Sequence, residues 1–219
     1  MNRIAIGSDR DVEYSPITVQ NFKVIRKPKY TFSTAFEISD LNGNVIYNCK
    51  FNPLGLSYNH KIENKNGKTI AKIDFEPNDV SKNFTLHIIV KNNNENKKEE
   101  KFSLAFKKKD NENSNTITYN INYYNKAVEA EDVIEINDKT YVDSNNKYLI
   151  VQYNVYHGSF NTGAPLICRS DQTLGTNTPW NYSVDVHPGT EPIFMLILHF
   201  GILINNIRNN VFSKNPFNQ

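Results

Sequence analysis

The chain has 219 residues, 38% hydrophobic and 12% aromatic, which is enough apolar material for one large domain and excludes a chain that is disordered throughout. Its 25 basic and 23 acidic residues give a formal net charge of +2, which is too small for a general nucleic-acid-binding protein. Two cysteines far apart in the sequence, Cys49 and Cys168, provide neither a disulfide framework nor the spacing of a structural zinc site. We expect both to be buried, reduced thiols.

The N-terminal residues reach a charge, at Arg3, before any apolar stretch long enough for a signal peptide begins. We therefore expect a cytoplasmic protein. Any contact with a membrane is expected to be peripheral, at the inner membrane surface. We expect residues 1–16 to form an N-terminal extension, residues 17–208 a single domain, and residues 209–219 a frayed C-terminal tail.

Most of the chain alternates between apolar and polar residues with a period of two. Because successive side chains of a strand point to opposite faces, each run predicts a strand with one buried face and one solvated face. Such runs occur at residues 30–38, 45–51, 71–75, 84–90, 102–106, 117–123, 149–155 and 182–186. The pattern predicts an antiparallel sheet.

An internal repeat indicates two successive hairpins near the start of the sheet. Residues 38–46 align with residues 62–70, and each segment reads as strand, Asn-Gly turn, strand. The Asn-Gly pair supplies the positive φ that a tight hairpin turn requires. Asn137 and Asp138 are interpreted as a further turn that separates two strands.

Two polar stretches are interpreted as solvated loops or hairpin tips. Residues 91–101 contain no apolar side chain, and residues 107–113 begin with three lysines. Strands resume on both sides of each stretch, so neither is expected to be a linker between domains.

Residues 193–204 break the two-residue period, because they are almost uninterruptedly apolar. Three interpretations are a buried helix, a membrane span and a buried strand. Twelve residues of helix extend only ~18 Å, against a hydrocarbon core of ~30 Å, and His199 lies within the segment. The helix is favoured because Thr190 is a candidate N-cap, Glu191 suits the positive end of the helix dipole, and proline is tolerated in a first turn.

A helix that is apolar on all sides must be buried on all sides. Only a surrounding barrel gives a single helix that environment. The sequence therefore predicts an all-β protein with one central helix: a closed antiparallel β-barrel of about twelve strands enclosing a hydrophobic C-terminal α-helix.

This architecture resembles the tubby C-terminal-like superfamily, and most closely its LURP-one-related members, with tubby and the phospholipid scramblases as relatives. Three segments carry the resemblance. Residues 36–47 (FEISDLNGNVIY) resemble the opening strand and hairpin, residues 62–73 (IENKNGKTIAKI) the second hairpin, and residues 182–194 (YSVDVHPGTEPIF) the last strand leading into the central helix. The resemblance covers residues 17–208, although residues 91–147 match only by strand count.

The resemblance implies a non-enzymatic protein that binds a membrane surface or a phosphoinositide. The alternatives are a phospholipid-scramblase-like membrane protein and a protein–protein interaction barrel without a lipid role. The basic residues through which tubby binds headgroups have no counterpart in this sequence, nor does the acidic calcium-binding segment of a scramblase. The expected partners are an anionic phospholipid membrane surface or unidentified proteins, with no nucleic acid, and the chain is expected to be a monomer.

The candidate lipid-binding residues are the four basic side chains Lys23, Arg26, Lys27 and Lys29. Each lysine or arginine near an anionic membrane contributes about 1 kcal/mol of attraction. The alternative is an ordinary edge strand, which also favours lysine and proline. A weaker candidate is the lysine triplet at residues 107–109.

No catalytic residue, metal ligand or cofactor is predicted. The sequence has no phosphate-binding glycine loop, nucleophile elbow or HExxH motif, and its five histidines lack metal-ligand spacing. His199, within the apolar segment, is interpreted as a neutral buried side chain rather than as a proton relay.

Overall fold

The computed structural model describes residues 4–6, 20–29, 33–51, 60–77, 83–90, 100–109, 116–142, 149–174 and 181–208. Within these ranges, the backbone alone is described at residues 20–29, 33–35, 51, 77, 140–142, 149, 172–174, 181–182 and 207–208. The predicted C-terminal tail, residues 209–219, lies outside the described residues, as does most of the predicted N-terminal extension.

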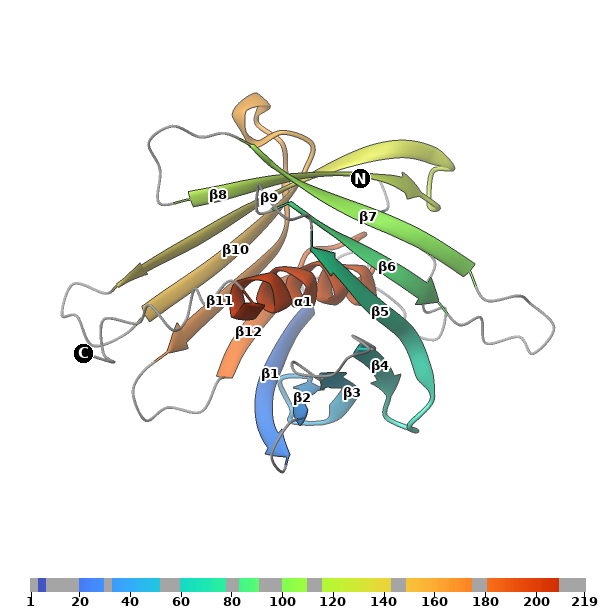
Figure 1. Cartoon of the computed structure of the whole chain (residues 1–219), viewed down its shortest axis with the longest axis vertical. Helices are drawn as coiled ribbons and strands as arrows, with labels where there is room; N and C mark the ends of the chain where they lie inside the picture. The colour runs from blue at the N-terminus through green and yellow to red at the C-terminus, as the bar shows by residue number, and fades with distance from the viewer. Residues whose placement is uncertain are drawn as a thin grey trace.

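Twelve β-strands and one α-helix make up the described fold (Figure 1). The first six strands are β1 (Gln20–Lys29), β2 (Ser33–Ser39), β3 (Val45–Phe51), β4 (His60–Asn64), β5 (Thr69–Pro77) and β6 (Phe84–Val90). The next six are β7 (Glu100–Lys109), β8 (Thr116–Asn125), β9 (Ala130–Val142), β10 (Leu149–His157), β11 (Leu166–Leu174) and β12 (Asn181–Val186). The helix α1 spans Pro192–Arg208, and a short 3-10 helix, η1, spans Phe160–Thr162.

The strands form one antiparallel, barrel-like sheet. Consecutive strands pair with each other from β1 to β12, and β1 also pairs with β12. The shortest ladder joins β7 to β8, where three residue pairs match residues 107–109 to residues 118–120. The predicted antiparallel all-β fold with a single C-terminal helix is confirmed.

The two predicted Asn-Gly hairpins are present. Gly43 and Gly67 have φ angles of 82° and 76°, and their amides donate to the carbonyl oxygens of Asp40 and Asn64, at 3.1 Å and 2.9 Å. The register shifts beside each turn, so each loop ends in a bulge with glycine in the left-handed conformation. The glycines alone supply the positive φ, because neither asparagine has one.

The helix α1 lies within the sheet (Figure 1), and residues 193–204 are all buried. Its first turn and its middle pack against different sides of the sheet. The ring of Phe200 lies 5.5 Å from that of Phe36 on β2, and the ring of Phe194 lies 5.0 Å from that of Tyr123 on β8. The interior is therefore filled by helix side chains.

The helix begins one residue later than the predicted cap implies. The amide of Met195 donates to the carbonyl oxygen of Glu191 at 3.3 Å, so Glu191, and not Thr190, is the first helical acceptor. Pro192 is the first helical residue, where its missing N–H is not needed. Among the described residues, the buried hydroxyl of Thr190 has no hydrogen-bond partner.

Residues 4–6, within the predicted N-terminal extension, belong to the core. Their side chains are 2–6% exposed. The amide of Ile4 donates to the carbonyl oxygen of Gly189, and the amide of Glu191 donates to that of Ile4. The carboxylate of Glu191, itself 2% exposed, accepts the amide of Ile6 at 2.6 Å. This segment fixes the chain that enters α1, which the sequence analysis did not predict.

Two further sequence predictions are wrong. Asn137 and Asp138, predicted as a turn, lie within β9, the longest strand. One side-chain oxygen of each is hydrogen-bonded there, since Thr118 donates to Oδ1 of Asn137 and Asn206 of the helix donates to Oδ2 of Asp138. The lysines at residues 107–109 belong to β7 and not to a loop.

Candidate anion-binding surface

The four predicted lipid-binding residues all lie in β1, whose backbone alone is described. Lys23 stands opposite Ser39, Arg26 opposite Phe36, Lys27 opposite Ala35 and Lys29 opposite Ser33. Positions along a strand alternate between its two faces, so the three lysines occupy positions of one face and Arg26 a position of the other. Nothing in the described structure tests whether the four bind a ligand.

The structure reveals a second group of basic residues on the outer face of the sheet. Lys50 of β3 stands opposite Lys61 of β4, which stands opposite Lys72 of β5. The flanking core residues Cys49, Ile62 and the other alternate positions of these strands are buried, so the three lysines point outward. We call Lys50, Lys61 and Lys72 the lysine row.

The register extends the lysine row at the level of the backbone. Lys27 of β1 pairs with Ala35, which pairs with Lys50. Lys72 pairs with Ile89, which pairs with Lys101 of β7. Lys27, one of the four residues predicted from the sequence, is therefore in register with the lysine row across the strands.

Charge within the row is only partly compensated. The amine of Lys50 forms an ion pair with Glu63 at 2.7 Å. In the part of the chain that the structure describes, neither Lys61 nor Lys72 forms an ion pair. Both side chains are half-buried, which confines their ammonium groups to the neighbourhood of the sheet.

Three lysines in one line disfavour the fold. Adjacent strands lie ~4.8 Å apart, so the row spans ~10 Å, about one Debye length at 0.1 M salt. Like charges directly opposite each other destabilise a sheet by roughly 0.2–1 kcal/mol per pair. An anionic surface or a ligand with several phosphate groups would relieve this repulsion.

The sequence contained a signal for part of this row. A hairpin centred on Asn66 and Gly67 brings residues whose numbers sum to about 133 opposite each other. Lys61 and Lys72 satisfy that rule, and both lie within the segment that resembles the second hairpin. The candidate residues Lys23, Arg26, Lys27 and Lys29 are instead close to each other in the sequence.

A polar network lies beside the row on β5, β6 and β7. The Nε2 atom of His87 is 2.6 Å from a carboxylate oxygen of Glu76, and its Nδ1 atom is 2.8 Å from the hydroxyl of Ser103. The order carboxylate, imidazole, hydroxyl is that of a nucleophilic triad. Glu76 and His87 are 61% and 46% exposed, however, and sit on a strand face, so we interpret them as a cross-strand network.

Burial keeps the imidazole of His199 and the thiol of Cys49 in their neutral forms. Burial lowers the pKa of His199 to about 3, so its imidazole is uncharged at neutral pH, as the sequence interpretation held. Burial, followed by the charge of Glu63, raises the pKa of the Cys49 thiol to about 12. Both predicted buried cysteines are confirmed as buried and free.

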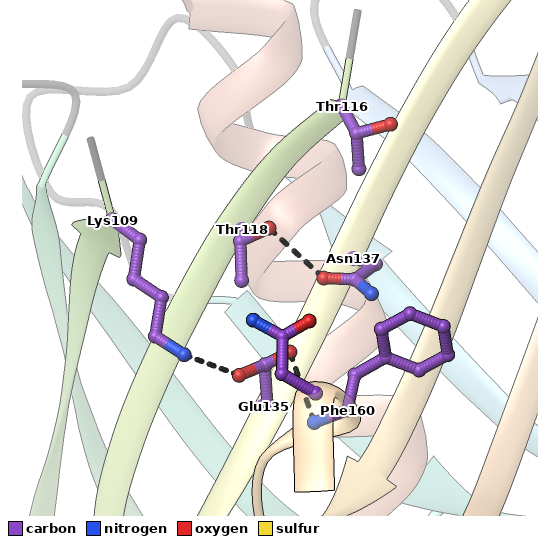
Figure 2. A pocket seen from close by; sticks show the side chains of 7 residues that line it. Lys109, Thr116, Thr118, Glu135, Asn137 and Phe160 are labelled. Carbon is purple, nitrogen blue, oxygen red and sulfur yellow. Dashed lines mark hydrogen bonds and ion pairs between the residues drawn. The ribbon is translucent and has the colours of Figure 1, made fainter. Parts of the chain in front are cut away.

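The described residues contain no group of three or more histidine, cysteine, aspartate or glutamate side chains that could hold a metal ion. Of the helices in the described ranges, none is both long enough and apolar enough to cross a membrane. A pocket of roughly 250 Å³ opens on the outer face near η1 (Figure 2). Its lining comes from β7, β8, β9 and η1, whereas the lysine row lies on β3, β4 and β5.

Comparison with known proteins finds no family model, no curated protein and no solved structure that matches this chain. The resemblance to tubby C-terminal-like and LURP-one-related proteins stays a prediction. The assignment of a function consequently depends on the geometry of the surface alone.

Proposed function

We propose that the chain is a non-enzymatic, closed β-barrel of the tubby-like kind that binds an anionic phospholipid surface reversibly. The lysine row is the single observation that carries the proposal. Lys50, Lys61 and Lys72 lie side by side across three strands, and two of them have no ion-pair partner among the described residues.

The filled interior supports an outer binding surface. Residues 193–204 of α1 are buried within the sheet, so helix side chains occupy the space in which a lipocalin-like barrel carries its ligand. Recognition through this fold is expected to use the outer faces of the strands and the loops that connect them.

The expected strength fits peripheral attachment. At about 1 kcal/mol for each lysine near an anionic membrane, the row supplies ~3 kcal/mol, or roughly a hundredfold gain in affinity over a neutral membrane. Lys27 and Lys101 lie farther round the curved sheet, where a flat bilayer approaches less closely. These two lysines contribute less attraction to a flat membrane than to a ligand that wraps round the sheet.

The predicted residues of β1 have a defined part in this proposal. Lys27 continues the lysine row, and Lys23 and Lys29 share its parity on the strand. Arg26 has the opposite parity, opposite the buried Phe36. We therefore assign the lysines of β1, and not Arg26, to the anionic surface.

Flotation with neutral and phosphoinositide-containing vesicles tests the proposal. Wild-type protein is expected to float with the anionic vesicles at 0.1 M salt and to be released at 1 M, where the Debye length falls from ~10 Å to ~3 Å. Replacing Lys23, Arg26, Lys27 and Lys29 with alanine changes the formal charge from +2 to −2 and should weaken binding. Attachment to neutral vesicles that resists salt would instead support the scramblase-like alternative, and no attachment would favour a protein–protein interaction barrel.

A further inference from the structure

The pocket beside η1 is formed by four elements on the outer face of the sheet (Figure 2). It is lined by one lysine from β7, two threonines from β8, two polar residues from β9 and two residues of η1: Lys109, Thr116, Thr118, Glu135, Asn137, Phe160 and Asn161. The connection between β10 and β11 folds over β8 and β9 and supplies the wall that a bare sheet would lack.

A buried carboxylate fixes that wall. Glu135 is 3% exposed, although it faces outward from β9. Its Oε1 atom accepts the backbone amide of Phe160 at 3.2 Å, and its Oε2 atom accepts the hydroxyl of Ser159 at 3.1 Å. Its Oε2 atom also pairs with the amine of Lys109 from β7. The pocket is therefore held open in the free protein, which lowers the cost of binding.

The same ion pair sets the charge that the pocket accepts. Lys109 and Glu135 neutralise each other inside the lining. An anion that approached Lys109 would meet the carboxylate of Glu135, and a cation that approached Glu135 would meet Lys109. The lining therefore favours a neutral ligand, in contrast to the lysine row.

The remaining groups suit a ligand with both hydroxyl groups and an apolar face. Thr118 donates its hydroxyl hydrogen to the Oδ1 atom of Asn137 at 3.0 Å, which leaves the amide nitrogen of Asn137 as a donor. Figure 2 shows that this nitrogen points away from Thr118, on the side of Phe160. The ring of Phe160 is half exposed and packs at 4.9 Å on that of Tyr156, which holds it in place at the rim.

We propose that this pocket binds a single neutral cyclic polyol, a pyranose sugar or an unphosphorylated inositol ring. The C–H face of such a ring packs on Phe160, and its hydroxyl groups pair with the amides of Asn137 and Asn161. The volume of roughly 250 Å³ lies below the ~300–1,000 Å³ of sites for drug-sized ligands, which fits one ring. The inference is independent of the proposed membrane surface, because it concerns a different part of the sheet.

The test is a titration of the full chain followed by NMR, with side-chain amide signals assigned through Asn137→Asp and Asn161→Asp variants. The probes are D-glucose, N-acetyl-D-glucosamine and myo-inositol, with glucose 6-phosphate as the charged match for glucose. We expect at least one neutral probe to shift the Asn137 and Asn161 signals with a Kd on the order of 1 mM, typical of a ligand of this size. Glucose 6-phosphate should bind at least fivefold more weakly than glucose. A response to glucose or N-acetyl-D-glucosamine alone identifies a sugar, and a response to myo-inositol alone identifies an inositol ring.

Two variants separate this pocket from weak binding elsewhere. Phe160→Ala removes the exposed ring and should weaken binding at least tenfold, because the apolar contact is lost. Tyr124→Ala is the matched control, since Tyr124 is 50% exposed and Phe160 is 51% exposed, and Tyr124 lies outside the lining. The proposal is overturned if no neutral probe shifts these amides at 50 mM, if glucose shifts them and glucose 6-phosphate binds as well as glucose, or if both alanine variants bind like wild type.

Discussion

Lys61 of β4 and Lys72 of β5 stand directly opposite each other on the outer face of the sheet, and neither forms an ion pair among the described residues. An arrangement that costs folding free energy, and that a single substitution would remove, is the kind of feature that a binding surface retains. The same two lysines therefore connect a stability measurement to a binding measurement.

The first prediction concerns that stability cost. Lys61→Gln removes the charge that faces both Lys50 and Lys72, and should raise the free energy of unfolding at low salt by roughly 0.2–1 kcal/mol for each facing pair, or Tm by about 0.4–4 °C for each pair. The gain should disappear at 1 M salt, where the repulsion is already screened. Lys107→Gln is the control, since Lys107 stands opposite the uncharged Asn120. Equal effects of the two substitutions on thermal melting would refute a specific repulsion.

The second prediction concerns the closest approach of the helix to the sheet. A Cβ atom added at Gly201 would lie 2.5 Å from a methyl carbon of Leu86, which is fully buried on β6. Gly201→Ala gains about 1 kcal/mol of helix propensity but should destabilise the protein, because overpacking costs ~1–3 kcal/mol. In a Leu86→Ala background, the same substitution should become stabilising. Chemical denaturation of wild type, the two single variants and the double variant completes a double-mutant cycle. If Gly201→Ala destabilises the protein in both backgrounds, the helix is packed differently from this structure.

The third prediction tests the burial of α1. Leu198 is fully buried, so Leu198→Asp places a charge without a partner in the interior and should cost several kcal/mol, enough to unfold the domain. Leu41→Asp is the control, because Leu41 is 76% exposed in a hairpin turn and should tolerate the same change. Circular dichroism melting distinguishes them, and a folded Leu198→Asp protein with an unchanged melting temperature is incompatible with a central helix.

The fourth prediction is a pH dependence. Burial acts to raise the pKa of Asp132, but the hydrogen bonds from His157, Asn125 and the Val133 amide outweigh it and hold the pKa below its usual value. A carboxyl whose pKa is lowered in the folded state stabilises the fold above its unfolded pKa of ~3.9, and the stabilisation is lost as the pH falls through the folded pKa.

Below about pH 4, wild-type stability should therefore fall more steeply than that of Asp132→Asn, while the variant is less stable at neutral pH. Glu131→Gln, at the exposed neighbouring position, is the charge-matched control. Urea denaturation across the range pH 2–7 measures the difference. If the free energy of unfolding falls equally steeply below pH 4 for wild type and for Asp132→Asn, the network around Asp132 does not stabilise the carboxylate.

Most of the strands and the helix follow from local patterns that the sequence shows, although β11 was not predicted. Alternation identified the faces of the sheet because one face of each strand packs on α1, and the apolar run at residues 193–204 identified the helix that occupies the interior. The strand β9 was missed in part because Asn137 and Asp138 have high turn propensity. Their partners, Thr118 and Asn206, come from elsewhere in the chain, and no local rule identifies them.

The candidate sites depend on the relation between strands. The β1 cluster was visible because its residues are neighbours in the sequence, whereas the lysine row emerges only when the register of β3, β4 and β5 is known. The pocket could not be predicted, since its wall depends on contacts between the β10–β11 connection and β9, among them the hydrogen bonds that the buried Glu135 accepts from Ser159 and Phe160. Nothing in the sequence around Glu135 indicates that role.

The central claim, that the lysine row binds an anionic membrane, is tested most directly by vesicle flotation of two triple variants with the same charge. One replaces Lys50, Lys61 and Lys72 with glutamine, and each triple variant changes the formal charge from +2 to −1. The control replaces three exposed lysines outside the row and outside the predicted candidates: Lys65, Lys68 and Lys139. We predict that the row variant loses at least tenfold in affinity for phosphoinositide vesicles at 0.1 M salt, while the control stays within about twofold of wild type. Equal binding of the two variants would contradict the account, because net charge and not the row would then determine attachment.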